Sequence, residues 1–368
     1  MLRLDLKKSI AIEMSNTTKS QTANSKNQVA DNSTVIGSAQ LEMGDALTRY
    51  ASWQPPTAIV SDGAYGLGLF PSEPSSPTEL ADWYAPHIAA WSRYSLPETT
   101  LWFWCSEIGW ATVHPVLANN GWQYRCTNIW DKGIGHIAGN VNSKTIRQFP
   151  IVTEVCVQYV RKVELPTCKG QFLSMQDWLR HEWLRTGLPL NRTNEACGLK
   201  NAATRKYFTK DRLWYFPPAE MMERIVAYAN LHGPPTQWPY FSLDGFSSVT
   251  AEQWSRLRSK WNHIHGATNV WSEPAVRGAE RLKDKKAKSV HANQKPLQLM
   301  ERIILASSDA GDAIWEPFGG LCSAGVASLR KGRKSFCAEI NSDYYQLAKA
   351  RLEREYELCR SFLFPDFL

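Results

Sequence analysis

Residues 311–340 read GDAIWEPFGGLCSAGVASLRKGRKSFCAEI, and this stretch decides the fold. An apolar strand, Ala313 to Trp315, runs into Glu316 and the loop Pro-Phe-Gly-Gly. Small residues from Ala324 to Leu329 predict a helix, and a second strand, Ser335 to Ala338, ends at Glu339. Glycines let the backbone approach a ligand, and an acid closing the second strand can accept hydrogen bonds from ribose hydroxyls. The unit predicts a nucleoside site, although a glycine pair alone also fits an ordinary strand–helix connection.

Length and composition predict a globular chain in a reducing compartment. The 368 residues suffice for about two domains, and 43% are hydrophobic. No apolar run reaches the roughly 18 residues of a membrane span, and the N-terminus does not resemble a signal peptide. The eight cysteines form no CxxC pair, which argues against zinc and disulfide frameworks. A net charge of +7 permits a polyanionic partner, and the sixteen tryptophans are interpreted as core residues.

Strands alternate with helices on both sides of a different central region. Strand-like runs occur at 57–60, 100–104 and 152–160, with helical stretches at 77–95 and 107–120. The central region is rich in Trp, Arg and Pro and is mostly helical by pattern. The sequence divides into a disordered tail (1–44), a first α/β half (45–165), a helical insert (166–266), a basic linker (267–290) and a second α/β half (291–368).

Two further motifs lie outside the opening stretch. Residues 58–68, AIVSDGAYGLG, end an apolar strand in an acid, small residues and an aromatic, which can form a catalytic pocket or simply a tight turn. Residues 291–304, HANQKPLQLMERII, place a proline at the start of an amphipathic helix. Alone, this second motif is best explained as a capped helix packed on a sheet.

Together, the three motifs resemble the S-adenosylmethionine-dependent DNA amino-methyltransferases in the permuted order called the beta class. In that family the catalytic tetrapeptide comes first, the target-recognition region follows, and the cofactor-binding half comes last. Asp62-Gly63-Ala64-Tyr65 is similar to the tetrapeptide, and Glu316 to Gly320 is similar to the family's Asp-Pro-Phe-x-Gly loop. The segments Asn128–Lys132, Glu154 and Asn269–Trp271 are weaker echoes.

The resemblance implies a doubly wound, mostly parallel, seven-stranded Rossmann-like sheet with a helical target-recognition insert. It implies S-adenosylmethionine as the cofactor and a catalytic turn at Asp62, Gly63, Ala64 and Tyr65. No metal site is expected. Carried over residue by residue, it implies cofactor contacts from Ser61, Gln294, Lys295, Pro296, Glu316, Pro317, Phe318, Gly319, Gly320, Glu339 and Ile340.

This chain departs from the family pattern at several positions. Gly63 and Ala64 stand where the family usually has two prolines, which predicts a less rigid turn. Cys322 stands where a second loop glycine is expected, and Glu316 replaces the leading Asp. The acid and the aromatic of the turn remain, so we expect an active enzyme.

The residue types suit methylation of an exocyclic amino group, which is a poor nucleophile. Asp62 can accept a hydrogen bond from the amino group, and the carbonyl of Gly63 can accept a second. Tyr65 can stack on a base flipped out of the duplex. The resemblance leans towards cytosine N4, at a short GC-rich palindrome such as GGCC, with adenine N6 as the alternative.

The insert predicts a reader of double-stranded DNA. Residues 175–208 suggest helices around a turn, similar to a helix-turn-helix, although a plain helical hairpin gives the same pattern. The recognition candidates are Lys200, Asn201, Thr204, Arg205 and Lys206, and the candidate phosphate contacts are Arg277, Lys285 and Lys286.

Rival interpretations remain open. They are an RNA or protein methyltransferase, a catalytically inactive DNA-binding relative, and a nicotinamide-dependent oxidoreductase. The last predicts a complete Gly-x-Gly-x-x-Gly loop, which Cys322 interrupts. We expect a protein of the bacterial cytoplasm, associated with the nucleoid and not with membranes. It would be monomeric or dimeric, acting either alone or with a restriction endonuclease.

Overall fold

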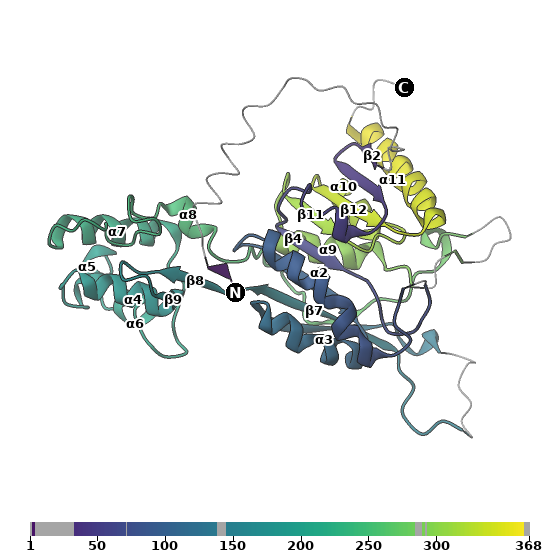
Figure 1. Cartoon of the computed structure of the whole chain (residues 1–368), viewed down its shortest axis with the longest axis horizontal. Helices are drawn as coiled ribbons and strands as arrows, with labels where there is room; N and C mark the ends of the chain where they lie inside the picture. Colours follow the sequence, from purple (N-terminus) through teal and green to yellow (C-terminus); the bar gives the residue numbers. More distant parts are fainter. Residues whose placement is uncertain are drawn as a thin grey trace. The chain divides into compact units, whose positions relative to one another are not determined.

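The computed structural model describes residues 2–3, 33–70, 72–137, 145–283, 289–290 and 293–363 (Figure 1). The chain forms two compact units. We call Gln28–Arg161 with Ser259–Leu368 the sheet unit, and Lys162–Arg258 with the N-terminal strand β1 (Leu2–Arg3) the insert unit. Among the described residues, no helix combines the length and apolarity needed to cross a bilayer.

A nine-stranded sheet forms the centre of the sheet unit, in the order β10-β6-β7-β5-β4-β11-β12-β3-β2. Central strands pair in parallel, as in β11 with both β4 and β12. Strand β7 runs antiparallel to β5 and β6, and β2 runs antiparallel to β3. The strands are β2 (Ser33–Ile36), β3 (Ala39–Met43), β4 (Ala58–Ser61), β5 (Thr100–Cys105), β6 (Trp122–Asp131), β7 (Thr153–Arg161), β10 (Val270–Ser272), β11 (Ala313–Glu316) and β12 (Lys334–Glu339).

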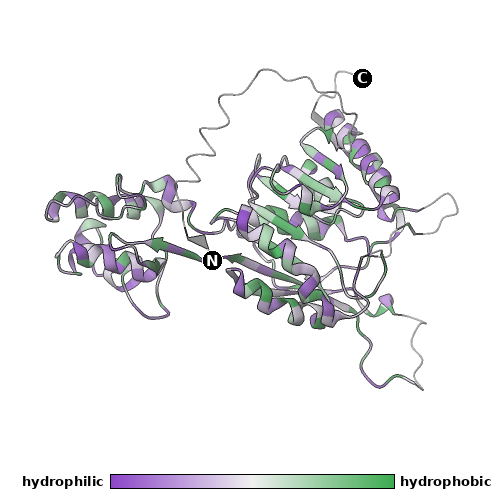
Figure 2. Ribbon diagram, in the orientation of Figure 1, coloured by the Kyte–Doolittle hydropathy of each residue, from purple (hydrophilic) through white to green (hydrophobic). Residues whose placement is uncertain are grey.

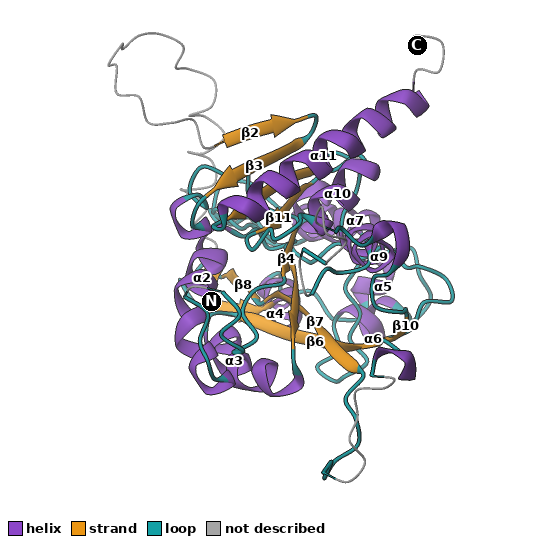
Figure 3. Cartoon of the chain, turned by 90° about the vertical axis from the view of Figure 1, so that its right-hand side faces the viewer, coloured by secondary structure: helices purple, strands orange, loops and turns teal. Residues whose placement is uncertain are grey.

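Helices cover both faces of this sheet, which confirms the doubly wound fold (Figures 1 and 3). Successive residues of a strand point to opposite faces. Ile59 therefore packs in the core on the side of α2 (Leu80–Tyr94) and α3 (Glu107–Asn119), whereas Ala58 and Val60 pack on the side of α9 (Leu297–Ser307) and α10 (Ser323–Arg330). Strand colouring in Figure 2 is largely apolar, as expected for strands buried on both faces.

The final helix, α11 (Ser342–Leu363), covers the sheet edge formed by β2 and β3 (Figure 3). Its Tyr345, Ala348 and Leu352 are buried against Leu41 and Val326 in one cluster. The opposite side of α11 is polar, so its hydropathy alternates along the helix in Figure 2.

Three predictions about organisation need correction. The sheet has nine strands rather than seven. Residues 33–43, assigned to a disordered tail of 1–44, form β2 and β3, because Ile36, Ala39 and Leu41 supply a buried apolar face. Residues 4–32 lie outside the described part of the chain. The linker of 267–290 contains β10, whose Trp271 is buried against the sheet.

The insert unit combines short helices with a small sheet of order β1-β8-β9. Its core is dominated by aromatic side chains, including Trp178, Trp183 and Trp254, so these tryptophans serve packing. Ser174 caps the first helix through the amide of Asp177. The elements are β8 (Val163–Pro166), β9 (Phe172–Ser174), α4 (Met175–Arg185), α5 (Arg192–Ala196), α6 (Ala203–Tyr207), α7 (Ala219–His232) and α8 (Ala251–Ser255).

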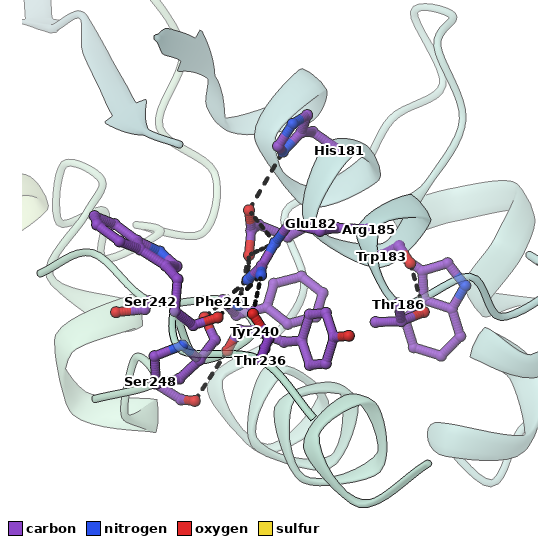
Figure 4. Close-up of polar contacts among 12 residues, drawn as sticks. His181, Glu182, Trp183, Arg185, Thr186, Thr236, Tyr240, Phe241, Ser242 and Ser248 are labelled. Atoms are coloured by element: carbon purple, nitrogen blue, oxygen red, sulfur yellow. Dashed lines mark hydrogen bonds and ion pairs between the residues drawn. The ribbon is translucent and has the colours of Figure 1, made fainter. Parts of the chain in front are cut away.

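A buried carboxylate fastens the loop before α8 to helix α4 (Figure 4). Glu182, fully buried, accepts a hydrogen bond from the amide of Phe241 at 2.8 Å and pairs with Arg185 at 2.7 Å. Arg185 also donates to the carbonyls of Trp238 and Pro239, both at 2.9 Å. Since each charge is paired and hydrogen-bonded, this group of side chains holds the insert unit together.

Candidate active site

Charged side chains from four segments meet at one edge of the sheet. Asp62 follows β4, Lys132 follows β6, Glu154 is near the start of β7, and Lys295 precedes α9. Because β7 is antiparallel to its neighbours, its start lies at the edge where the parallel strands end. Ligands of open α/β sheets bind at that edge. The site therefore combines residues separated by more than two hundred positions in the chain.

The ammonium of Lys295 lies at the centre of this cluster. It is 2.7 Å from Asp62 Oδ1, 3.3 Å from Glu154 Oε2 and 3.0 Å from the hydroxyl of Tyr65. The Lys295 side chain is only 1% exposed. Burial alone would lower the pKa of Lys295, but the carboxylates of Asp62 and Glu154 outweigh burial and raise it. Lys295 is therefore held as a cation against the turn that carries Asp62.

Glu154 balances the charge of this cluster. It pairs with Lys132 as well as with Lys295, and its side chain is 10% exposed. Burial would raise the pKa of Glu154, whereas the cations of Lys295 and Lys132 prevail and lower it. The buried Glu154 thus faces two ammonium groups, the partly exposed Asp62 faces one of them, and Glu154 remains ionised at neutral pH.

Tyr65 is fixed through its hydroxyl, which lies 3.1 Å from both Asp62 Oδ1 and Glu154 Oε2. Burial and the neighbouring carboxylates keep the pKa of Tyr65 well above its usual value, so the hydroxyl retains its proton. Both contacts to Asp62, from Tyr65 and from Lys295, use Oδ1. Within the described residues, Oδ2 of Asp62 has no hydrogen-bond donor. One carboxylate oxygen is thus anchored and the other is available to a ligand.

The turn between Asp62 and Tyr65 is fixed by a hydrogen bond and by close packing. The Tyr84 hydroxyl donates to the carbonyl of Ala64 at 3.0 Å. A Cβ atom on Gly63 would lie 2.6 Å from the ring of Phe318 and 2.7 Å from the Tyr84 hydroxyl. The absence of both prolines therefore does not leave this turn unsupported. Gly63 instead permits close packing between this turn and the loop after β11.

The loop after β11 is shaped by left-handed residues and a buried acid. Gly320 and Cys322 both have φ of +51°, so Cys322 lies in the left-handed region that favours glycine. Glu316 accepts hydrogen bonds from the amides of Ala324 and Gly325 at the start of α10. Burial raises the pKa of Glu316 to about 7, although these two amides favour the carboxylate. Glu316 thus supports the loop from within the core.

Glu339 closes the opposite side of this loop. Its Oε2 accepts the amide of Gly320 at 2.6 Å, and its Oε1 accepts the amide of Asn341 at 2.7 Å. Burial raises the pKa of Glu339 against the opposing effect of these amides. A carboxylate offers about four acceptor positions, so the backbone amides leave room for a ligand hydroxyl. Gly320 is partly exposed beside Glu339, whereas Gly319 is buried, and a Cβ there would lie 2.9 Å from the carbonyl oxygen of Ala338. These residues fit a nucleoside whose ribose hydroxyls face Glu339.

The other predicted cofactor residues have various surroundings. Gln294 donates to the carbonyl of Glu280 and accepts from the amide of Leu282, so it holds the neighbouring segment. Phe318 packs against the aromatic side chains of α2 and against Gly63. Ser61 is buried at the end of β4, Pro296 precedes the first turn of α9, Pro317 is buried, and Ile340 is 58% exposed beside Glu339.

The DNA-binding candidates are dispersed, and only some have free side chains. Lys200, Asn201 and Arg205 are exposed around the short helices α5 and α6. Thr204 bonds instead to Thr193 and to the carbonyl of Leu190. The exposed Lys206 lies over the Tyr215 ring, and the exposed Arg277 donates to the carbonyl of Gly135. Lys285 and Lys286 lie outside the described residues.

The sequence interpretation missed two functional candidates. Lys132 and Glu154 were noted only as parts of weaker motif echoes, yet they complete the charged cluster. The signal for Glu154 was a single acid within the otherwise apolar run of β7. Lys295 was assigned to the cofactor, whereas the structure places its ammonium against Asp62.

Comparison with known proteins gives a family match over most of the chain. A family model described as DNA methylase matches residues 57–350. The DNA adenine methyltransferase YhdJ of Escherichia coli (strain K12) is 41% identical over 93 residues, which cover 25% of this chain and 30% of that protein. The Type II methyltransferase M2.DpnII of Streptococcus pneumoniae is 38% identical over 89 residues, covering 24% and 31%. The chain thus aligns with about a third of the length of these relatives.

Solved structures give weaker likenesses. The crystal structure of the M1.HpyAVI–SAM complex has a TM-score of 0.43 at 16% identity, covering 85% of this chain and 99% of that one. The PvuII DNA methyltransferase, described as cytosine-N4-specific, has a TM-score of 0.48 at 11% identity, covering 88% and 92%. These scores are too low to carry an argument about the site.

Proposed function

The chain belongs to the DNA methylase family, whose cofactor is S-adenosylmethionine, and on that premise we propose that it methylates an exocyclic amino group of a base in double-stranded DNA. One observation carries the proposal. The turn Asp62–Tyr65 has an open carboxylate oxygen and an aromatic ring, and it packs through Gly63 onto the loop beside Glu339. The turn proposed to hold the base therefore packs directly against the loop proposed to hold the nucleoside.

The residues of the turn can hold an amino group in a reactive orientation. Asp62 Oδ2 would accept one N–H of the base, and the carbonyl of Gly63 would accept the other. Tyr65, fixed by its hydroxyl, would stack on the flipped ring. Withdrawing the amino lone pair from the ring makes the nitrogen a better nucleophile. After transfer, the proton that the nitrogen loses would pass to Oδ2 of Asp62.

The family cofactor would lie between the loop after β11 and the end of β12. When bound, S-adenosylmethionine supplies an electrophilic methyl group. Glu339 would accept the ribose hydroxyls, and the exposed Ile340 would lie against an apolar surface of the ligand. The contact between Phe318 and Gly63 would keep the two pockets in register.

Both amino bases fit this geometry. The sequence leans towards cytosine N4, with GGCC as the predicted site, whereas the relative YhdJ carries the name adenine methyltransferase. We therefore retain adenine N6 as the second candidate. Exposed Lys200, Arg205 and Lys206 of the insert unit support contact with the DNA backbone or bases. A companion endonuclease and the oligomeric state remain predictions from the sequence.

Replacement of Asp62 by Ala tests the proposal. We expect methyl transfer to DNA to fall by about 10²–10⁴, as for a lost general base, while affinity for S-adenosylmethionine stays near wild type. Radiolabelled methyl transfer and calorimetric cofactor binding measure the two quantities. Glu353→Ala, which removes an exposed carboxylate of α11, is the matched control. Unchanged transfer in the Asp62 variant would refute the assignment.

A further inference from the structure

A second feature of the catalytic turn lies immediately after Tyr65. The segment from Gly66 to Phe70 carries two leucines, Leu67 and Leu69, which are 62% and 68% exposed. Single exposed apolar residues are common on protein surfaces. Two of them on one short segment beside a catalytic turn call for a different explanation, and the hydrogen bonding of the segment supplies it.

One carboxylate fixes the backbone of this segment. Glu73 Oε1 accepts the amides of Tyr65 at 2.7 Å, Gly66 at 3.2 Å and Leu67 at 3.4 Å. Its Oε2 accepts the amide of Leu69 at 2.6 Å. Backbone amides turned towards an acid form a concave anion-holding arrangement. The carboxylate therefore holds the amide groups of both leucines in place.

Further backbone and side-chain contacts fix the segment from Gly66 to Phe70. Gly66 has φ of +76°, and a Cβ there would lie 2.5 Å from the backbone nitrogen of Pro77. Gly68 donates its amide to the carbonyl of Pro74 at 3.0 Å, and Phe70 packs edge-on against Trp83 of α2. Such fastening restricts local opening. The two leucines are thus exposed side chains on a stiff support.

We propose that Leu67 and Leu69 form an apolar wedge that enters the DNA stack beside the target base and holds the space that the flipped base leaves. The proposal rests on the proposed function. Leu67 is two residues from Tyr65, so it lies within about 7 Å of it along the chain, or about two base steps of roughly 3.4 Å. Apolar side chains, leucine among them, are used to separate stacked bases. A wedge that pushes against stacked bases must be rigid, which is what the bonds to Glu73 provide.

The test uses duplexes built around the methylated site once sequencing has located it. One duplex is intact, and the other carries a mismatched base opposite the target. A mismatch lowers the free energy needed to flip the target base, so a wedge is needed less on the mismatched duplex. We compare single-turnover methylation by the full-length wild type and by the double variant Leu67→Ala/Leu69→Ala, together with binding of S-adenosylmethionine.

On the intact duplex we expect the double variant to be slower than wild type by about tenfold or more. On the mismatched duplex its rate should return to within about threefold of wild type, with cofactor affinity unchanged. Val35→Ala is the matched control, because Val35 is 70% exposed on β2, four strands away from β4. It should not alter either rate.

Equal rates of the double variant and wild type on the intact duplex would overturn the proposal. An equal loss on both duplexes would also overturn it, since the leucines would then act on the chemical step. Phe149 is the strongest rival, because it is 95% exposed elsewhere in the sheet unit. A mismatch-rescued defect in Phe149→Ala alone would reassign the wedge. A wild type that methylates no DNA would refute the proposed function, and the wedge with it.

Discussion

Replacement of Lys295 by Met tests the buried charge cluster. The wild-type ammonium contacts Asp62 at 2.7 Å and Glu154 at 3.3 Å, and its side chain is 1% exposed. Removing one partner of a buried ion pair leaves the other charge uncompensated, which costs about 3–5 kcal/mol. In the variant, Lys132 would still pair with Glu154, but Asp62 would lose its ammonium partner. We therefore expect the free energy of unfolding of the sheet unit to fall by about 3–5 kcal/mol at about pH 8.

The stability difference between the wild type and the Lys295→Met variant should depend on pH. In the wild type, cations hold the folded-state pKa of Glu154 below its usual value. The stability from this group is present above the unfolded pKa, and it is lost as pH falls through the lower folded pKa. Without Lys295, only Lys132 opposes the effect of burial, so we expect the pKa of Glu154 to rise and mild acid to protonate this carboxylate. The free energy of unfolding that the variant loses relative to the wild type should therefore become smaller as the pH falls from about 8 to about 5.

Urea denaturation followed by hydrogen exchange of peptides from β4 and β7 measures this difference without interference from the insert unit. Lys334→Met, at an exposed position, is the matched control and should change stability by less than about 0.5 kcal/mol. In the double variant Lys295→Met/Glu154→Gln, a coupling of about 1–3 kcal/mol should recover part of the loss. A loss of unfolding free energy in Lys295→Met that stays constant with pH would refute the reasoning. Losses of the two single variants that simply add in the double variant would also refute it.

Three further predictions follow from particular contacts. Glu339→Ala should weaken S-adenosylmethionine binding by about 1–3 kcal/mol in calorimetry, and unchanged affinity would exclude Glu339 from the cofactor site. Gly63→Pro, which restores the family residue, should lower stability by about 1–3 kcal/mol through contact with Phe318; a higher melting temperature would contradict that. Glu182→Ala should destabilise the insert unit by about 3–5 kcal/mol, whereas Glu195→Ala, at an exposed ion pair, should leave the midpoint of the same denaturation experiment nearly unchanged.

Local patterns in the sequence predicted the central fold well. Strand β11, helix α10 and strand β12 lie within one or two residues of their predicted positions, because apolar runs, small residues and turn residues agree there. Strands β2 and β3 were missed, because their apolar residues are few and gain burial only from α11 and β12. The polar composition of residues 1–44 led to the prediction of a disordered tail there.

The site was predicted only in part, for a similar reason. Asp62 and Tyr65 belong to a local motif that sequence order can reveal. The contacts of Lys295 with Asp62 and of Phe318 with Gly63 join segments more than two hundred residues apart. No local pattern specifies such pairings. The same holds for Cys322, whose backbone is left-handed although its side chain is not that of glycine.

The central claim is that the protein methylates an amino group of DNA and that Asp62 holds that amino group, and one measurement tests it most directly. DNA is isolated from a methylation-free bacterial host that expresses the wild type or Asp62→Ala. It is then sequenced with a readout that separates N4-methylcytosine from N6-methyladenine. We predict one of these bases at a defined short sequence in the wild-type sample and neither in the variant. No methylated base with the wild type, or the same methylation with the variant, would contradict the claim.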